Sequence, residues 1–139
     1  MTDSSASAPH AGYAGAFRAC PLIAILRGVT PEGAAAHAGV LYEAGFRVIE
    51  VPLNSPQPFD SIEAMARALP ADAIVGAGTV LEVADVETVQ AAGGQLIVMP
   101  HADTDIIAAA KSRRLASVPG VATPTEAFRA LQCGADALK

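Results

Sequence analysis

Two ionisable side chains interrupt otherwise apolar stretches of this sequence. Lys139 closes a short apolar segment at residues 137–139, and Glu50 lies in another at residues 48–51. A lysine amine that burial keeps uncharged can attack a ketone and form a Schiff base. A nearby glutamate can carry protons to and from the bound intermediate. These two residue types therefore indicate covalent carbonyl chemistry.

Each of the two residues also has a simpler interpretation. Lys139 can be a terminal side chain that is merely solvated, and its position alone favours that interpretation. Glu50 can form an ion pair with Arg27 or Arg47, although a glutamate is unusual in a parallel strand, where apolar runs are the rule.

Two further features follow predicted strands. Arg27 comes directly after the strand at residues 22–26, where a guanidinium can grip a carboxylate or phosphate with two parallel hydrogen bonds. It can equally be a surface arginine at a turn. The glycine-rich residues 76–79 can admit a ligand close to the backbone, but Thr79 and Glu82 also have the spacing of a helix capping box. Taken alone, this motif favours the structural interpretation.

Alternating strands and helices are expected to position these residues. Short β-type runs alternate with longer alanine-rich segments, at the spacing of a strand plus a crossover helix. Most of the runs are apolar at nearly every position, which is typical of strands that are covered on both faces of a parallel sheet. We expect strands at residues 22–26, 48–51, 73–76, 96–99, 115–118 and 137–139.

Helix starts are marked in the segments between these strands. Thr30 and Thr123 each precede a proline, which is the usual order of an N-cap and the first helical position. Thr123 also has the spacing of a capping box. Asp103 or Thr104 can cap a helix that runs to about residue 112.

An internal repeat links the second, fourth and sixth predicted strands. Three glycines each follow an alanine-rich helical stretch, where a left-handed C-terminal glycine belongs: Gly45, Gly93 and Gly134. The residues five positions later are Glu50, Val98 and Lys139. Inward side chains of alternate strands share one layer of a (β/α)₈ barrel, so we expect these three in one layer near its C-terminal mouth. Buried charge there is costly unless it is paired or functional.

The expected fold class is α/β, a (β/α)₈ TIM barrel of which this chain holds about the first six βα units. Such barrels usually need at least about 200 residues, whereas this chain has 139. We therefore expect residues 1–20 to be a disordered tail and residues 21–139 to form a barrel that is truncated at the sixth strand.

Composition excludes several functional classes. A chain that is 52% hydrophobic and 17% charged is not intrinsically disordered, and a net charge of −5 with nine scattered cations argues against nucleic acid as a partner. The sequence has no apolar run of membrane-spanning length and no signal-peptide pattern. Cys20 and Cys133 indicate small buried residues of a reducing compartment. Without a cluster at ligand spacing, we expect no metal site and a cytoplasmic location.

Six motifs, in their order and spacing, make the chain from residue 21 onward resemble the class I aldolases of 2-keto-3-deoxy-6-phosphogluconate and its galactonate epimer. They are Ile23-Ala-Ile-Leu-Arg-Gly, the segment Ala44-Gly-Phe-Arg-Val-Ile-Glu-Val-Pro-Leu-Asn-Ser-Pro, Gly76-Ala-Gly-Thr-Val, Gln95-Leu-Ile-Val-Met-Pro-His, Pro119-Gly-Val-Ala-Thr-Pro-Thr-Glu-Ala-Phe and Gly134-Ala-Asp-Ala-Leu-Lys.

This resemblance implies a (β/α)₈ barrel, usually trimeric, that cleaves a phosphorylated 2-keto-3-deoxy sugar acid into pyruvate and glyceraldehyde 3-phosphate and needs no cofactor. By the resemblance, the Schiff-base lysine is Lys139 and the general acid/base is Glu50. Arg27 and Thr79 match groups near the pyruvate carboxylate, and Pro100 matches a residue that lines the same pocket. The family's phosphate site lies in loops after strands seven and eight, which we expect to lie beyond this chain.

The loop after Glu50 bears on which epimer is the substrate. Gluconate-specific relatives usually carry an arginine there, whereas this chain has Asn54 within a Pro-Leu-Asn-Ser-Pro segment that is similar to the galactonate branch. Two prolines stiffen the loop, so Asn54 or Ser55 could bind the C4 hydroxyl at a fixed position. The galactonate epimer is therefore the expected substrate. The alternatives are the gluconate epimer, 4-hydroxy-2-oxoglutarate, and a non-catalytic barrel fragment that binds partners.

Overall fold

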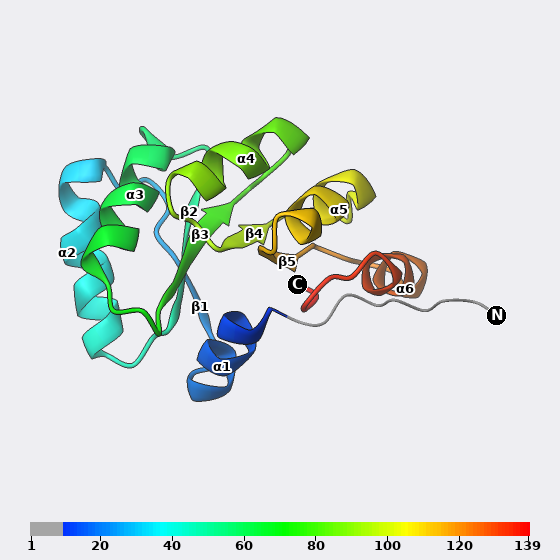
Figure 1. Ribbon diagram of the computed structural model, residues 1–139, viewed down its shortest axis with the longest axis horizontal. Helices are drawn as coiled ribbons and strands as arrows, with labels where there is room; N and C mark the ends of the chain where they lie inside the picture. The colour runs from blue at the N-terminus through cyan, green and yellow to red at the C-terminus, as the bar shows by residue number, and fades with distance from the viewer. Residues whose placement is uncertain (1–9) are drawn as a thin grey trace.

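A computed structural model describes residues 10–139 as a curved parallel sheet with helices on both faces (Figure 1). The strands pair in sequence order, each parallel to the next. They are β1 (Ile23–Ile25), β2 (Val48–Pro52), β3 (Ile74–Gly78), β4 (Leu96–Val98) and β5 (Ala116–Val118). The helices are α1 (Ala11–Ala19), α2 (Pro31–Glu43), α3 (Pro58–Ala68), α4 (Val83–Ala91), α5 (Thr104–Ser112) and α6 (Pro124–Gln132). Repeated parallel βα units in this order are the α/β class expected from the sequence.

The outer face of the sheet forms the larger of two hydrophobic cores. Alternate residues of the central strands, such as Ile49, Val75 and Ile97, pack there against helices α2 to α6. Because side chains alternate along a strand, the residues between them point to the opposite face. Both faces are therefore covered, which explains why the strands are apolar at nearly every position.

The inner face carries the second core, and α1 covers it. Tyr13 and Ala16 of α1 pack with Val48, Ile74 and Leu96 from three successive strands. In Figure 1, α1 lies on the side of the sheet away from α2 to α5. This helix corrects the expected disordered tail for residues 10–20. The His10 imidazole accepts the Tyr13 amide and caps the helix, and the buried ring of Tyr13 anchors it. Residues 1–9 of that expected tail lie outside the described residues.

The five strands coincide closely with five of the six that the sequence predicts, and the sixth differs. Residues 137–139 are not a regular strand, yet their segment runs along β5. The Asp136 amide donates to the Ser117 carbonyl, and the Lys139 amide donates to the Pro119 carbonyl, each at 2.9 Å. Two hydrogen bonds over so short a segment hold it beside the sheet without extending a regular ladder.

Predicted helix boundaries are confirmed where side chains supply the cap. Thr123 and Glu126 form a full capping box at the start of α6, and Asp103 caps α5 by accepting two backbone amides. Thr30 precedes α2 with a proline at the first turn, but its side chain makes no cap hydrogen bond. The three repeat glycines all have positive φ, as a left-handed helix end requires: Gly45 at 105°, Gly93 at 84° and Gly134 at 92°.

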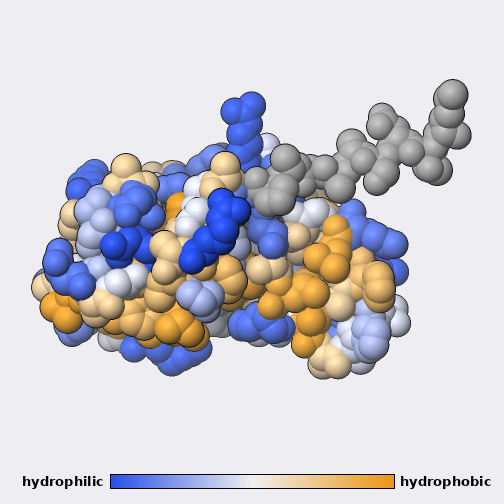
Figure 2. Space-filling view, turned by 90° about the horizontal axis from the view of Figure 1, so that it is seen from below, coloured by the Kyte–Doolittle hydropathy of each residue, from blue (hydrophilic) through white to orange (hydrophobic). Residues whose placement is uncertain are grey.

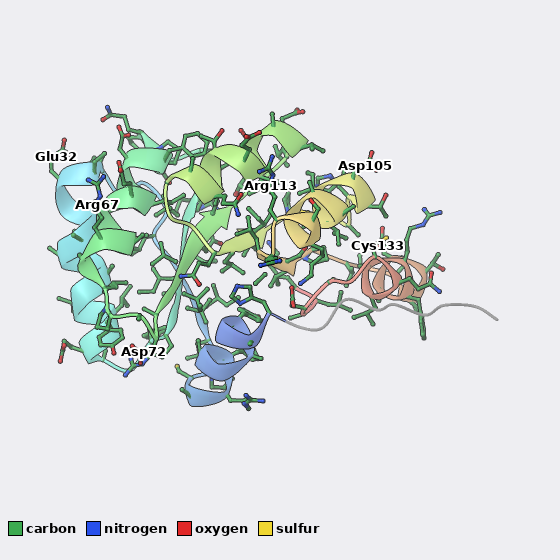
Figure 3. All side chains as sticks on the ribbon, viewed as in Figure 1. Glu32, Arg67, Asp72, Asp105, Arg113 and Cys133 are labelled. Atoms are coloured by element: carbon green, nitrogen blue, oxygen red, sulfur yellow. The ribbon has the colours of Figure 1, made fainter. Side chains whose placement is uncertain are left out.

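Charged residues gather on the helices away from the sheet. Glu32 of α2, Arg67 of α3 and Asp105 of α5 are exposed there (Figure 3). The face that Figure 2 displays mixes hydrophobic and hydrophilic areas. Leu22 and Ile25, at the β1 edge of the sheet, are 56% and 54% exposed. No helix among residues 10–139 is long and apolar enough to span a membrane.

Candidate active site

A cavity of about 300 Å³ lies on the inner face of the sheet. Glu50 of β2, Val98 of β4 and Lys139 all line it, which confirms that the internal repeat places these three residues together. Tyr13 and Phe17 of α1 supply an apolar wall. A carboxylate and an amine thus share one largely apolar space, as the barrel geometry predicts.

Glu50 is buried in this cavity, and its carboxyl group lacks a full set of hydrogen-bond partners. It is 4% exposed, and one of its oxygens, Oε2, is buried with no hydrogen-bond partner. Burial raises the pKa of Glu50 to about 7, although the positive charges of Lys139 and Arg27 pull it downward. A carboxyl group with that pKa can both release and accept a proton near neutral pH.

Lys139 is held by its backbone rather than by its side chain. Its amide donates to the Pro119 carbonyl and its own carbonyl accepts the Val121 amide, both at 2.9 Å. The side chain is exposed, as the solvated-lysine interpretation expects, so the buried amine of the Schiff-base interpretation is wrong on this point. The segment of Lys139 lies at the edge of the sheet, so within residues 10–139 only β5 flanks it. Lys139 and Glu50 nevertheless line the same cavity, and the positive charge of Lys139 lowers the raised pKa of Glu50.

A second buried carboxylate, Asp136, fixes the segment that carries Lys139. Its Oδ1 accepts the His10 amide at 2.7 Å, and its Oδ2 accepts the Ser117 amide at 2.8 Å and the Lys111 ammonium at 2.7 Å. The Asp136 side chain is 1% exposed and that of Lys111 is 10% exposed. One carboxylate therefore joins the start of α1, strand β5 and helix α5 to the residues that precede Lys139.

Sequence reasoning missed Asp136, although a signal was present. Asp136 lies in the apolar segment at residues 135–138, as Glu50 does in its strand. The oxygens of Asp136 bind the start of α1, β5 and α5, and it is not among the residues that line the cavity. The same argument that singled out Glu50, a charge inside an apolar run, could have identified Asp136 as a buried residue in need of partners.

The loops after β1 and β2 are joined by two hydrogen bonds. Arg27 Nη1 donates to Asn54 Oδ1 at 2.9 Å, and the Gly28 amide donates to Ser55 Oγ at 3.0 Å. Arg27 and Asn54 are exposed, whereas Ser55 is only 8% exposed. The structure therefore brings two of the predicted binding residues into direct contact. The alternative ion pair of Glu50 with Arg47 is wrong, because Arg47 binds Asp72.

Thr79 and Pro100 lie in the loops after β3 and β4. Thr79 has φ of 55°, the left-handed region that a threonine rarely adopts, so the surrounding structure holds it in a strained conformation. The alternative capping role is wrong, since α4 begins at Val83 with Glu82 as its N-cap residue. Pro100 is exposed, and its carbonyl lies against Gly120 of the loop after β5.

Within the described part of the chain, no three His, Cys, Asp or Glu residues lie close enough together to hold a metal ion.

Comparison with known protein families shows which family the chain matches. A family model described as KDPG and KHG aldolase matches residues 14–139. The chain belongs to this aldolase family. The match begins within helix α1. It includes Glu50 and Lys139, the two ionisable residues that line the cavity.

Several curated relatives of this aldolase chain carry related names. It is 50% identical over 119 residues to the probable 2-dehydro-3-deoxy-6-phosphogalactonate aldolase of Rhizobium meliloti (strain 1021), covering 86% of this chain and 56% of that protein. The 2-dehydro-3-deoxy-6-phosphogalactonate aldolase of Escherichia coli (strain K12) is also 50% identical, with 86% and 58% covered. The KHG/KDPG aldolase of the same organism is 32% identical. The chain thus spans a little over half the length of these relatives.

Solved structures of the family share the fold. One described as native KDPGal superposes with a TM-score of 0.82 at 49% identity, covering 85% of this chain and 57% of the other. The KDPG aldolase of Legionella pneumophila, solved with pyruvate captured as a covalent carbinolamine intermediate, gives a TM-score of 0.77 at 27% identity, with 92% and 60% covered. These matches confirm the expected α/β fold class.

Proposed function

We propose that this protein is a class I aldolase that cleaves 2-dehydro-3-deoxy-6-phosphogalactonate to pyruvate and glyceraldehyde 3-phosphate, without a metal ion or organic cofactor. The observation that carries this proposal is the shared cavity of Glu50 and Lys139. Two 50% identical relatives named for this substrate support it. So does the carbinolamine captured in the Legionella relative, because that adduct precedes a Schiff base.

Lys139 is the nucleophile in this proposal. Its uncharged amine attacks the C2 ketone to give a carbinolamine, and loss of water leaves an iminium ion. The iminium ion accepts the electron pair of the C3–C4 bond when that bond breaks, which leaves an enamine of pyruvate. Protonation at C3 and hydrolysis then release pyruvate and restore the amine.

Glu50 moves the protons that this sequence requires. It removes the proton of the C4 hydroxyl, through a bound water, as the aldehyde forms, and it later returns a proton to C3. A pKa of about 7 suits both directions, since a carboxyl group of ordinary acidity would hold its proton too weakly to return it. The unpartnered Oε2 leaves one oxygen of Glu50 without a competing hydrogen bond.

The loop residues bind the substrate in this proposal. Arg27 and Thr79 hold the pyruvate carboxylate, Pro100 lines the pocket, and Asn54 contributes to recognition of the C4 hydroxyl. The hydrogen bond from Arg27 to Asn54 links the residue that would bind the carboxylate to the residue that would bind the C4 hydroxyl. The competing substrates are the gluconate epimer and 4-hydroxy-2-oxoglutarate, and a comparison of kcat/KM for all three chooses among them.

We also propose the cellular setting that the family resemblance implies. The protein would act as a cytoplasmic homotrimer in galactonate catabolism, and its partners would be the phosphorylated sugar acid and pyruvate.

Reductive trapping tests the proposed nucleophile. The sequence contains only two lysines, Lys111 and Lys139. Incubation with pyruvate and borohydride should leave one reduced pyruvate adduct, and peptide mapping should place it on Lys139. Lys111→Arg is the matched control and should trap normally, because the arginine keeps a positive charge beside Asp136. Full trapping in Lys139→Ala would overturn the assignment of Lys139 as the nucleophile, whereas a wild-type protein that traps no pyruvate would favour a non-catalytic role for this chain.

A further inference from the structure

The carboxyl group of Glu50 lies directly against the backbone of Gly78, the last residue of β3. A Cβ atom at Gly78 would meet three atoms of that carboxyl group, Oε2, Cδ and Oε1, all well below the 3.0 Å that real Cβ contacts respect. The nearest neighbours of such a Cβ all belong to Glu50. The space that glycine leaves at this position is therefore filled from within the protein.

Gly76, two residues earlier on the same strand, is constrained in a different way. A Cβ there would collide with the backbone carbonyl and the Cβ of Leu96 in the neighbouring strand. Gly76 thus allows β3 and β4 to approach each other, whereas Gly78 accommodates a side chain. The sequence motif suggested a ligand close to these glycines, but the Glu50 carboxyl group occupies that place at Gly78.

Glycine inside a strand has an energetic cost. It weakens the strand because it loses more backbone freedom on folding and contributes no side chain to packing. Gly78 is held on its β2 side, where it pairs with Pro52 and its carbonyl accepts the Leu53 amide at 2.8 Å. A glycine kept at such a position commonly marks a close approach, and here the approaching group is the carboxyl group of Glu50.

We propose that Gly78 is a positioning residue for Glu50: the missing side chain keeps the carboxyl group of Glu50 against β3, inside the cavity that Lys139 shares. The structural part of this proposal is independent of the reaction. Its catalytic consequence rests on the proposed function, in which Glu50 moves protons for the intermediate bound to Lys139.

Gly78→Ala is the direct test. The colliding atoms are the far end of a flexible side chain, so the fold should survive and the carboxyl group should move. We expect kcat to fall about 10- to 100-fold, which is part of the roughly 100- to 10,000-fold that a well-placed acid/base group contributes, with little change in KM. The pKa of Glu50 should also shift away from about 7, read from the carboxyl ¹³C resonance of Glu50. The charged groups acting on it are Lys139 and Arg27, and Tyr13 faces the same cavity.

Two further variants keep this test decisive. Glu50→Ala removes the colliding atoms, so adding Gly78→Ala to it should change neither stability nor residual activity. If Gly78→Ala alone fails to fold, the double variant should fold. Gly76→Ala is the contrast, because it collides with backbone and should lose stability whatever stands at position 50.

The outcomes separate this proposal from the proposed function. An unchanged Glu50 resonance in Gly78→Ala, or an unfolded double variant, would overturn the positioning role. If the wild-type protein fails to trap pyruvate, the proposed function is lost, but the resonance still tests Gly78. Normal trapping with unchanged kcat and an unchanged resonance in Gly78→Ala would retain the function and reject the positioning role.

Discussion

Two buried carboxylates differ in their hydrogen-bond partners: Glu50, in strand β2, and Asp136, in an apolar segment beside β5. Asp136 accepts three hydrogen bonds, from two backbone amides and the Lys111 ammonium, and is 1% exposed. Glu50 is 4% exposed, and its Oε2 has no partner. Similar burial therefore produces one fully satisfied carboxylate and one that holds a raised pKa of about 7.

This difference in hydrogen bonding suits Asp136 to a structural role and Glu50, in the proposed function, to proton transfer. A carboxylate surrounded by donors has its acceptor sites filled and holds the donating segments in place. A carboxylate short of donors is stabilised by gaining a proton, and it can give that proton up only at an energetic cost to the fold. Asp136 fixes the segment of Lys139, and Glu50 is the group that moves protons in the proposed function.

Loss of Asp136 should have the largest effect on stability. Asp136→Ala leaves the Lys111 ammonium and the Ser117 and His10 amides without their acceptor in a buried site. We expect a loss of about 3–5 kcal/mol in the free energy of unfolding, the usual effect of breaking a buried ion pair. Urea unfolding followed by circular dichroism measures it. Lys111→Met, which leaves both amides paired with Asp136, should cost less, and a loss below about 1 kcal/mol in Asp136→Ala would contradict the structural role.

Removal of the charge at Glu50 should act in the opposite direction and depend on pH. The pKa of Glu50 is raised from about 4.5 to about 7 in the folded state, so the folded protein binds more protons than the unfolded one between these values. Stability therefore falls as the pH rises from about 4.5 to 7 and then levels off. Glu50→Gln escapes that fall, and we expect it to be about 1–3 kcal/mol more stable than wild type at pH 8.

The pH dependence is the control for the Glu50 variant. The advantage of Glu50→Gln should shrink as the pH is lowered towards 5, where wild-type Glu50 is protonated as well. Unfolding curves at pH 5 and pH 8 for both proteins give the comparison. An advantage of equal size at both pH values would show that packing, rather than ionisation, distinguishes the two side chains.

Much of the fold could be predicted because periodic apolar runs and helix caps act locally. The repeat of Gly45, Gly93 and Gly134 even placed Glu50 and Lys139 in one layer, since strand alternation fixes which side chains point inward. Helix α1 was missed because its signals are not local. Its N-cap is a histidine, an unusual choice, and the burial of Tyr13 depends on contacts with strands far along the chain.

The contacts around the site residues could not be predicted from the sequence. Glu50 stands out in its strand, but nothing in the order of residues shows that Gly78 lies against its carboxyl group. The contact of Arg27 with Asn54 joins loops 27 residues apart, and Asp136 binds an amide 126 residues away. Such contacts arise from the curvature and stagger of the whole sheet, which propensity and spacing do not encode.

A carboxylate in a partly exposed ion pair should show the smallest effect and complete the comparison. Glu63 of α3 pairs with Arg67 one turn later, and the Arg67 side chain is 77% exposed (Figure 3). Water solvates both charges, so Arg67→Ala should lower the free energy of unfolding by only about 0.3–0.5 kcal/mol, and less in high salt. Urea unfolding in low and high salt tests this against Asp136→Ala. If Arg67→Ala and Asp136→Ala lower the free energy of unfolding by the same amount, ion pairing and not burial determines how much these carboxylates stabilise the fold.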